Sequence, residues 1–444
     1  MNPHAHQIPT PVAHILTVGD ELLAGDIVDG NKAKMASCAR AQGLEVRRAV
    51  TVRDRLEEIA EALRQAAEHA DVCLVSGGLG PTTDDLTSAS VAEAAGVSMV
   101  RDAEAEARLE EKFRRYGRPM ADANRKQADF PEGADILANP IGSAEGLRST
   151  LPGGRQCQVF VMPGVPRELE KMLAEQVVPR LHERFGLITI PRRVYRVLGH
   201  GESSVAAKVE PLVAEARLRS PGLAAVYVHY RASMPEVSVI VEATQGDDGP
   251  RATVEELASF DAPFIEVLSP GIYGIGAATL PPRVVAAMVE ARLRLAVAES
   301  CTGGGLGAQI TAVPGSSACF RGGIISYDNE IKQSLLGVAE ALLVEHGAVS
   351  EPVSRAMAVG ARDRFGSDLG VGITGIAGPG GGSPEKPVGT VHVAVADGSE
   401  TFHKALRLRG NRGTVQRAAA LWATKLVWDR LVARGVAAID HRHD

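Results

Sequence analysis

Cysteine is scarce in this sequence, and the cysteines that occur follow no pairing pattern. There are five among 444 residues: Cys38, Cys73, Cys157, Cys301 and Cys319. They form no C-x-x-C motif and lie near no histidine pattern, which argues against a zinc framework and against a set of disulfides. An odd number of unpaired cysteines is typical of the reducing cytoplasm, and we expect that location.

Long apolar runs are also absent. No run approaches the roughly eighteen residues of a membrane span, so we expect no membrane helix. Residues 1–11 lack the charged-then-apolar order of a signal peptide, and we expect flexible tails there and at residues 437–444.

A net charge of −6 argues against a nucleic-acid-binding surface. The length of 444 residues predicts two or three domains.

Strand-like and helix-like patterns alternate in the first part of the chain. We predict strands over residues 13–18, 46–52 and 72–75, separated by helices over residues 31–41 and 56–68. Such alternation is typical of an α/β domain, in which a parallel sheet is covered by helices on both faces.

A glycine-rich stretch follows the third of these strands, with the sequence SGGLGPTTDD at residues 76–85. Glycines let the backbone approach a ligand closely, and free N–H groups can hold a phosphate. The adjacent carboxylates of Asp84 and Asp85 can hold a hard divalent cation or orient a water molecule. A loop with a capped helix explains the same residues, because aspartate is favoured at helix starts.

A second stretch combines a candidate nucleophile with glycines. An apolar strand over residues 293–298 leads into Glu299, Ser300, Cys301, Thr302 and three glycines. A hydroxyl at such a strand end is exposed beside free backbone N–H groups, which are the parts of a nucleophile and an oxyanion site. Cys301 is a rival nucleophile, because a helix N-terminus would activate a thiolate. Most serines at strand ends, however, only cap helices.

A candidate general base follows the next strand, predicted over residues 323–326. Asp328 is a plausible N-cap, which places Lys332 near the first turn of a helix. The positive helix end presses the pKa of this lysine downward, and Glu330 opposes that effect, so the sequence leaves the sign open. A serine and a lysine with a tyrosine, here Tyr327, can hydrolyse amides without a metal.

Two further loops are candidates for phosphate binding. Residues 374–382 form a glycine cluster after an apolar strand over residues 369–373, and Gly410 to Gly413 precede a terminal helix. Turn formation alone is the alternative for each loop. Between the two ends of the chain, residues 178–270 predict a small α+β module that includes a strand at 264–267, and residues 271–282 predict a linker.

The segments AESCTGG, SYDNEIK and TGIAGPGGGSPEKPVGT resemble, in unbroken order over residues 280–436, the C-terminal domain of the CinA (competence/damage-inducible) family. That domain also occurs alone as the nicotinamide mononucleotide amidohydrolase PncC. The resemblance implies an α/β amidohydrolase domain at 283–436, with Ser300 as nucleophile, Lys332 as base, and Tyr327 either as proton relay or as the group that holds the tetrahedral oxyanion. It implies substrate contacts from Thr302, Gly303, Gly304, Thr374, Gly375, Ala377, Gly378 and Arg412, and no cofactor.

The segments TVGDELLAGDIVDGN and GGLGPTTDDLT resemble the molybdopterin-binding fold. This implies a three-layer domain at residues 12–177, and in the CinA branch a metal-dependent ADP-ribose pyrophosphatase. The implied nucleotide site contains Glu21, Asn31, Gly77, Gly78, Gly80, Asp84 and Asp85. Asp84 and Asp85 would hold Mg, Mn or Co, with K as a further ion. Both activities would then serve salvage of pyridine nucleotides.

The chain departs from the family pattern at three places. Glu145 follows Gly142-Ser143-Ala144 where relatives have proline, which predicts a carboxylate in a ligand loop. Asp29-Gly30-Asn31 replaces Asn-Thr-Asn, and Asn411 replaces aspartate before Arg412.

The module at 178–270 is similar to the KH-like module of CinA proteins. It lacks a G-x-x-G loop flanked by basic residues, so we expect a spacer or homodimer contact rather than nucleic-acid binding. The alternatives for the whole chain are a non-catalytic competence or DNA-damage adaptor, and a pterin-binding first domain.

Overall fold

The computed structural model describes residues 10–187, 189–246, 249–398 and 400–439. The chain divides into two compact units, residues 1–190 with 244–251, and residues 191–243 with 252–444. Of the expected tails, residues 1–9 and 440–444 lie outside the described part.

The first unit is built on a six-stranded sheet in the order β2-β1-β3-β8-β7-β6. Four strands are parallel and the last two antiparallel. Their bounds are β1 Val12–Val18, β2 Glu45–Val52, β3 Val72–Ser76, β6 Asp135–Leu137, β7 Gly146–Thr150 and β8 Gln158–Met162. The strands β1, β3 and β8 are buried along their whole length, as expected for apolar strands covered on both faces.

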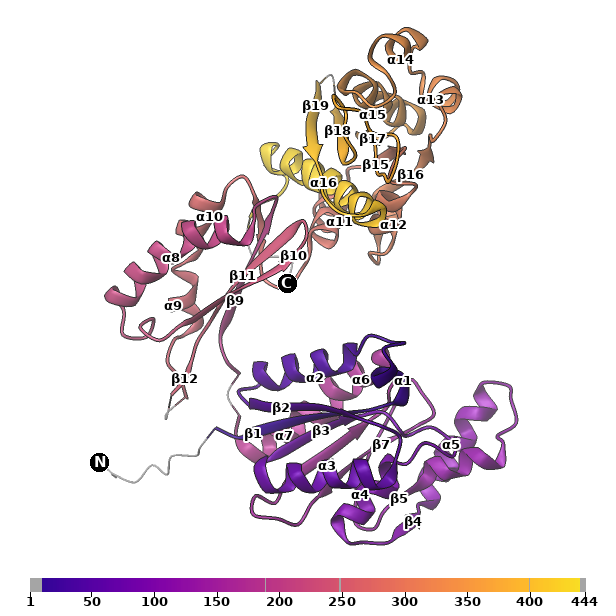
Figure 1. Cartoon of the computed structure of the whole chain (residues 1–444), viewed down its shortest axis with the longest axis vertical. Helices are drawn as coiled ribbons and strands as arrows, with labels where there is room; N and C mark the ends of the chain where they lie inside the picture. The colour runs from indigo at the N-terminus through magenta and orange to yellow at the C-terminus, as the bar shows by residue number, and fades with distance from the viewer. Residues whose placement is uncertain (1–9, 188, 247–248, 399, 440–444) are drawn as a thin grey trace. The chain divides into compact units, whose positions relative to one another are not determined.

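Helices cover both faces of this sheet (Figure 1). Alternate residues of β1 enter different cores, because successive side chains of a strand point to opposite faces. Ile15 packs with α2 (Gly30–Ala41) and α6 (Pro166–Met172), whereas Leu16 packs with α3 (Leu56–His69) and α4 (Thr87–Ala95). The predicted three-layer α/β domain is therefore present.

A small lobe follows α4. It contains β4 (Met99–Arg101), α5 (Ala103–Arg115), η1 (Asp122–Ala128) and β5 (Asp129–Pro131), and β4 pairs with β5.

The predicted boundary between residues 177 and 178 is wrong. It falls within a continuous helical run made of α6, the π-helical turn η2 (Leu173–Val177) and α7 (Val178–Phe185). Leu181 of α7 is buried in the same core as Met172 of α6. The first unit therefore continues to Ile190.

The second unit begins with a four-stranded sheet in the order β10-β11-β9-β14. The strands are β9 Arg192–Leu198, β10 Tyr227–Ser233, β11 Glu236–Glu242 and β14 Ile272–Ile275, and the helices are α8 Glu202–Arg219, α9 Val254–Ala258 and α10 Asp261–Leu268. The short strands β12 (Gln245–Gly246) and β13 (Gly249–Pro250), which lie in the segment 244–251 of the first unit, pair with each other. This sheet with its helices is the predicted α+β module.

Two predictions in this module are wrong. The expected strand at residues 264–267 is helix α10, in which Phe264 and Leu268, four residues apart, are both buried on one face. The expected linker at residues 271–282 contains β14, which pairs with β9, and the start of α11 (Leu280–Glu290). Ile272 and Tyr273 are buried in cores, so the glycines and prolines of this segment mark turns rather than a linker.

The rest of the second unit is a five-stranded sheet in the order β16-β15-β17-β18-β19, parallel from β16 to β17 and antiparallel beyond. The strands are β15 Leu295–Glu299, β16 Phe320–Ile325, β17 Leu369–Gly375, β18 Thr390–Asp397 and β19 Glu400–Arg407, and the last was not predicted. One face packs against α11, α12 (Gly305–Thr311) and α16 (Arg412–Ala433); the other packs against α13 (Asn329–Leu336) and α15 (Glu351–Phe365). The short elements η3 (Ser316–Ala318) and α14 (Glu340–His346) complete it.

Helix α16 also contacts the α+β module. The Lys425 amine donates a hydrogen bond of 2.8 Å to the carbonyl of Pro270 and pairs with Asp429. Trp422 lies so close to Gly199 that a β-carbon there would stand 2.4 Å from its ring. The second unit therefore has one continuous interior, in which Leu198 and Tyr273 share a core with Trp428.

Two further features concern membrane-spanning helices and the arginines of the α+β module. The described part of the chain contains no helix with both the length and the hydropathy needed to cross a bilayer. Arg193 pairs with Asp261, and Arg196 pairs with Glu236 and the carbonyls of Gly276 and Ala277. These arginines hold the module together.

A histidine pair predicts how stability depends on pH. His392 and His403 share a hydrogen bond of 3.0 Å, and His403 lies 3.2 Å from Glu351. Burial lowers the pKa of both imidazoles below the ordinary value, so the unfolded chain binds protons more readily as the pH falls. We expect the melting temperature to fall from about pH 7 to about pH 5, and less steeply in a His392→Gln/His403→Gln variant. Equal slopes for both proteins would contradict this.

Candidate functional site

The first candidate site lies where the parallel strands of the second unit end. Ser300 directly follows β15, and its N–H donates 3.0 Å to the carbonyl of Ile373 in β17. On the other side, the N–H of Ser326 donates 2.8 Å to the carbonyl of Glu299. Ser300 therefore stands between the ends of β16 and β17, at the edge where the sequence predicted it.

A buried carboxylate fixes the turn after Ser300. The Glu299 side chain accepts hydrogen bonds from the N–H groups of Leu306 (3.0 Å) and Gly307 (2.8 Å) at the start of α12. Between these anchors, Gly303 and Gly304 adopt positive φ angles of 62° and 98°, which other residues rarely adopt. This role was not predicted, because Glu299 follows an apolar strand in the sequence and has no local pattern of its own.

This turn leaves donors free. Among the described residues, the N–H groups of Thr302 and Gly304 make no hydrogen bond, and the buried Thr302 hydroxyl has no partner. Unpaired donors beside a nucleophile are what an oxyanion site requires. The predicted Thr302–Gly304 stretch is therefore placed for that role.

Lys332 reaches the same strand edge. Asp328 caps α13 as predicted, and the almost fully buried Lys332 amine donates hydrogen bonds to the carbonyls of Ser326 (2.8 Å), Tyr327 (3.2 Å) and Asp328 (3.4 Å). Burial lowers the pKa of this amine, against the opposing charge of Asp328. The cause is therefore desolvation, and Glu330 is not the opposing group. In the described structure, no hydrogen bond joins the amine directly to Ser300.

Arg412 connects two of the predicted loops. Its guanidinium donates 2.9 Å to the hydroxyl of the exposed Tyr327 and 2.8 Å to the carbonyl of Gly378. Asn411 caps α16 by accepting a hydrogen bond from the Thr414 N–H (2.9 Å), so its replacement of aspartate keeps the cap.

The remaining predicted residues lie in the loop that begins in β17. Thr374 is buried, and its hydroxyl donates 2.8 Å to the carbonyl of Ala348. Gly375 packs against Val391, and a β-carbon at Gly378 would meet Val388. Ala377 is buried in the core. Thus only Gly378 of this group touches Arg412 directly.

The rival nucleophile is inert. Cys301 is buried, and burial together with the nearby Glu299 carboxylate raises the pKa of its thiol to about 12. A thiol with such a pKa is not a nucleophile near neutral pH. Burial outweighs the expected activation by the helix N-terminus, and the Glu299 carboxylate at that end of α12 acts in the same direction as burial.

The second candidate site lies in the first unit, at the carboxyl end of β3. A cavity of about 390 Å³ is lined by the predicted residues Glu21, Gly77, Gly78, Gly80, Asp84 and Asp85. Three polar residues that sequence reasoning missed line it as well, Asp54, Gln127 and Glu168, together with Ser143 of the expected ligand loop. Glu168 was overlooked because it reads as an exposed first-turn residue of a helix.

The carboxylates of this cavity do not form a complete metal site. Asp84 is exposed, and Asp85 accepts a hydrogen bond of 2.8 Å from the N–H of Thr82. Within the described residues, no group of three or more His, Cys, Asp or Glu side chains gathers as a ligand set. Magnesium is commonly bound by one or two carboxylates together with substrate phosphates, and this donor set suits that mode.

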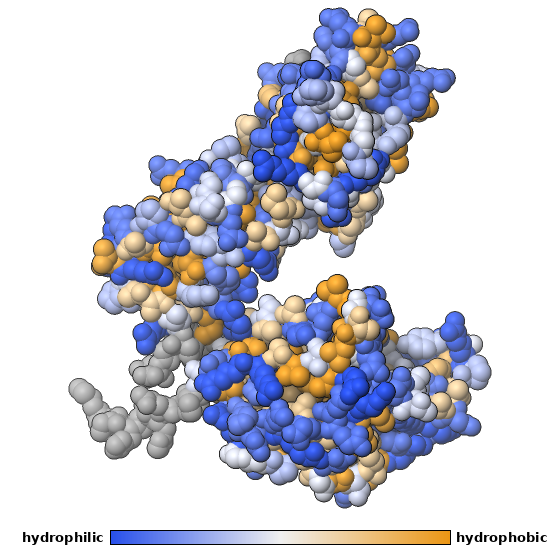
Figure 2. Space-filling view, in the orientation of Figure 1, coloured by the Kyte–Doolittle hydropathy of each residue, from blue (hydrophilic) through white to orange (hydrophobic). Residues whose placement is uncertain are grey.

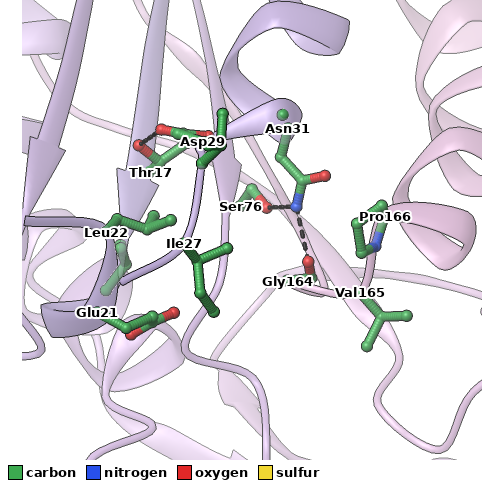
Figure 3. A pocket seen from close by; sticks show the side chains of 13 residues that line it. Thr17, Glu21, Leu22, Ile27, Asp29, Asn31, Ser76, Gly164, Val165 and Pro166 are labelled. Atoms are coloured by element: carbon green, nitrogen blue, oxygen red, sulfur yellow. Dashed lines mark hydrogen bonds between the residues drawn. The ribbon is translucent and has the colours of Figure 1, made fainter. Parts of the chain in front are cut away.

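Asn31 lies in an adjoining cavity of about 310 Å³ (Figure 3). Its amide nitrogen donates to the Ser76 hydroxyl (3.0 Å) and the Gly164 carbonyl (2.7 Å). Asp29 caps α2 and accepts a hydrogen bond of 2.7 Å from the Thr17 hydroxyl. The departure at Asp29 therefore has a structural role beside this cavity.

The prediction for Glu145 is wrong. Its carboxylate forms two hydrogen bonds with Arg108 (3.0 and 2.8 Å), lies 3.8 Å from Lys112, and does not line either cavity. Arg108 and Lys112, two of the cations of α5, compensate the charge of the buried Glu145. The ligand loop therefore presents Ser143 and Ala144, without an added negative charge.

Comparison with known proteins identifies both domains. The model of the CinA C-terminal domain matches residues 277–431, and that of a probable molybdopterin-binding domain matches residues 14–183. A CinA-like protein of Shewanella sp. (strain MR-4) is 39% identical over 424 residues, which cover 95% of this chain and 96% of that protein. One from Anaeromyxobacter dehalogenans (strain 2CP-1) is 41% identical over 413 residues, covering 93% and 98%.

Among solved structures, the competence/damage-inducible protein of Agrobacterium tumefaciens is 36% identical, with a TM-score of 0.33. The aligned region covers 35% of this chain and 93% of the Agrobacterium chain.

The Glu299 contact predicts a stability effect. Glu299→Gln would leave at least one of the two N–H groups facing an amide NH₂ instead of a carboxylate oxygen, in a buried place. We expect the free energy of unfolding to fall by about 1–3 kcal/mol in urea titrations. The matched control is Glu330→Gln at an exposed site, which should change little. Equal effects from both variants would show that the cap contributes nothing.

Proposed function

The chain belongs to the CinA family, and from this premise we propose that its second unit hydrolyses the carboxamide of nicotinamide mononucleotide to nicotinate mononucleotide and ammonia. One observation carries the proposal. The N–H of Ser326, at the end of β16, donates a hydrogen bond to the carbonyl of Glu299, at the end of β15. This brings Ser300 next to the backbone carbonyls that accept hydrogen bonds from the Lys332 amine. Beside them lie free N–H donors.

In the proposed reaction, the Lys332 amine, whose pKa is lowered by burial, accepts in its unprotonated form the proton of the Ser300 hydroxyl as the serine oxygen bonds to the carboxamide carbon. The N–H groups of Thr302 and Gly304 stabilise the oxyanion that forms. Ammonia leaves when the carbon–nitrogen bond breaks, taking the proton from Lys332. Water then attacks the acyl-serine ester in the reverse of this sequence. Lys332 accepts a proton from the water and returns it to the Ser300 oxygen as the ester bond breaks. Tyr327 is close to the backbone carbonyls that hold the Lys332 amine. It would relay the proton between Ser300 and Lys332.

Arg412 would bind the substrate phosphate. Two of its N–H groups hold the Tyr327 hydroxyl and the Gly378 carbonyl, and a guanidinium has five donors. The others are available for a phosphate, for which the planar fork of arginine is well suited.

Ammonia release from nicotinamide mononucleotide tests this proposal. With EDTA present to silence the first unit, Ser300→Ala should lower the rate by at least about a thousandfold. Cys301→Ala should change it little, because that thiol stays protonated. Loss of activity in Cys301→Ala but not in Ser300→Ala would overturn the assignment. If wild type released no ammonia, the adaptor role would take precedence.

A second activity is favoured by the cavity in the first unit. We propose that it cleaves the diphosphate of ADP-ribose, with the glycines of residues 77–80 next to the diphosphate. Asp84 and Asp85 would hold a divalent ion (Mg, Mn or Co), bound jointly with the substrate. Such an ion would neutralise the phosphate charge.

Replacement of Asp84 tests this second activity. Asp84→Asn should lower AMP release from ADP-ribose by at least about tenfold and weaken the protection that Mg²⁺ with ADP gives against thermal unfolding. Asp26→Asn, an exposed aspartate outside both cavities, is the matched control. Unchanged AMP release in Asp84→Asn would refute the role of this carboxylate.

A further inference from the structure

A side chain from the last helix holds the peptide unit between Cys301 and Thr302. The side-chain amide of Gln416, in α16, donates a hydrogen bond of 2.9 Å to the Cys301 carbonyl, across 115 positions of sequence. Because a carbonyl can only accept, this contact requires a donor at position 416. The visible surface of the second unit is mainly hydrophilic (Figure 2), whereas this contact is partly buried, where water competes less for the carbonyl.

The neighbouring carbonyls are bonded within the turn itself. The Ser300 carbonyl accepts a hydrogen bond of 3.1 Å from the N–H of Gly303, and the Thr302 carbonyl accepts one of 3.1 Å from the N–H of Gly305. Of these three carbonyls, that of Cys301 is the one held by a side chain. The orientation of its peptide unit therefore depends on α16.

The direction of this hydrogen bond determines where the Thr302 N–H points. The cis peptide bonds of the described chain all precede prolines, so the bond between Cys301 and Thr302 is trans. In a trans unit, the C=O and the N–H point in opposite directions. The carbonyl points toward Gln416, and the N–H therefore points away from it. Within the described residues, this N–H makes no hydrogen bond. A hydrogen bond to the carbonyl also polarises the N–H of the same peptide unit, which makes it a stronger donor.

Helix α16 contacts the candidate site at two places. Arg412 and Gln416 lie four residues apart, so their side chains leave the helix on the same face. Arg412 contacts the Tyr327 hydroxyl, and Gln416 contacts the turn after Ser300. One helix face thus carries the arginine proposed for the substrate phosphate and a glutamine that fixes a donor proposed for the oxyanion.

We propose that Gln416 is a positioning residue for amide hydrolysis, which orients the Thr302 N–H toward the oxyanion and strengthens it as a donor. Gln416 touches no reacting atom and acts through the Cys301 carbonyl. The inference rests on the proposed deamidation and adds a residue that none of the sequence motifs contains. Because the oxyanion forms only after the bound substrate begins to react, this role affects kcat rather than KM.

The kinetic test compares Gln416→Met with Gln333→Met. Methionine is similar to glutamine in length but has no N–H donor, and Gln333 is a half-buried glutamine of α13 that serves as the matched control. Loss of a whole oxyanion donor lowers kcat by about 100- to 1,000-fold. With nicotinamide mononucleotide as substrate, Gln416→Met should therefore lower kcat by about tenfold or more and change KM by less than about threefold. Gln333→Met should change neither.

An NMR measurement tests the contact without activity. Cys301 and Thr302 form the only cysteine–threonine pair in the sequence. Protein with ¹³C-carbonyl cysteine and ¹⁵N-threonine therefore gives a single amide–carbonyl correlation. This signal should shift in Gln416→Met, because the carbonyl loses its hydrogen bond, and stay in place in Gln333→Met. Gln416→Glu keeps the shape of the side chain but cannot donate when ionised, so it should give the same two results if Gln416→Met folds poorly.

The inference fails if the signal does not move in either Gln416 variant, if kcat is unchanged, or if the loss lies in KM. Equal effects of Gln416→Met and Gln333→Met would contradict it as well. If wild type releases no ammonia, the proposed function fails and the catalytic role of Gln416 with it. A shifted signal in that case would still establish that Gln416 holds the Cys301 carbonyl, so the two failures are distinguishable.

Discussion

The contact between the Glu299 carboxylate and the start of α12 is the constraint on which the candidate amidase site depends. It joins the end of β15 to the helix after the turn, so the turn between them has little freedom. Because this carboxylate uses the N–H groups of Leu306 and Gly307, these two donors are not free for a substrate anion. The free donors are those of the turn itself, next to Ser300. The same charge helps to keep the neighbouring thiol of Cys301 protonated.

Sequence patterns predicted the features that depend on local order. The alternation of apolar segments predicted the α/β layers, and the Asp328 cap placed Lys332 correctly in α13. Features that depend on distant partners were not predictable. The sequence Phe-Ile-Glu-Val at 264–267, with three apolar residues, fits a strand or a helix, and only packing selects α10. The pairing of Glu145 with Arg108 joins residues 37 positions apart, and the Lys332 pKa depends on burial, which no local pattern shows.

The two candidate sites use the same structural principle with different chemistry. In both units, a parallel strand ends in glycines that leave the backbone open to a ligand, beside strands that deliver polar side chains. In the second unit, the reactive groups are a hydroxyl and a buried amine, and the surrounding carbonyls and N–H groups hold them in place. In the first unit, carboxylates face an open cavity and are suited to a cation that arrives with its ligand.

Helix α16 sets a limit on how this protein can be divided. Arg412 at its start belongs to the site, whereas Trp422 and Lys425 pack against Gly199 and Pro270, far earlier in the chain. A fragment cut at residue 277, where the match to the C-terminal family domain begins, would expose an indole ring and strip a buried amine of its carbonyl partner. Recombination or domain grafting at that point would therefore require new surface residues on α16, and a cut before β9 would not.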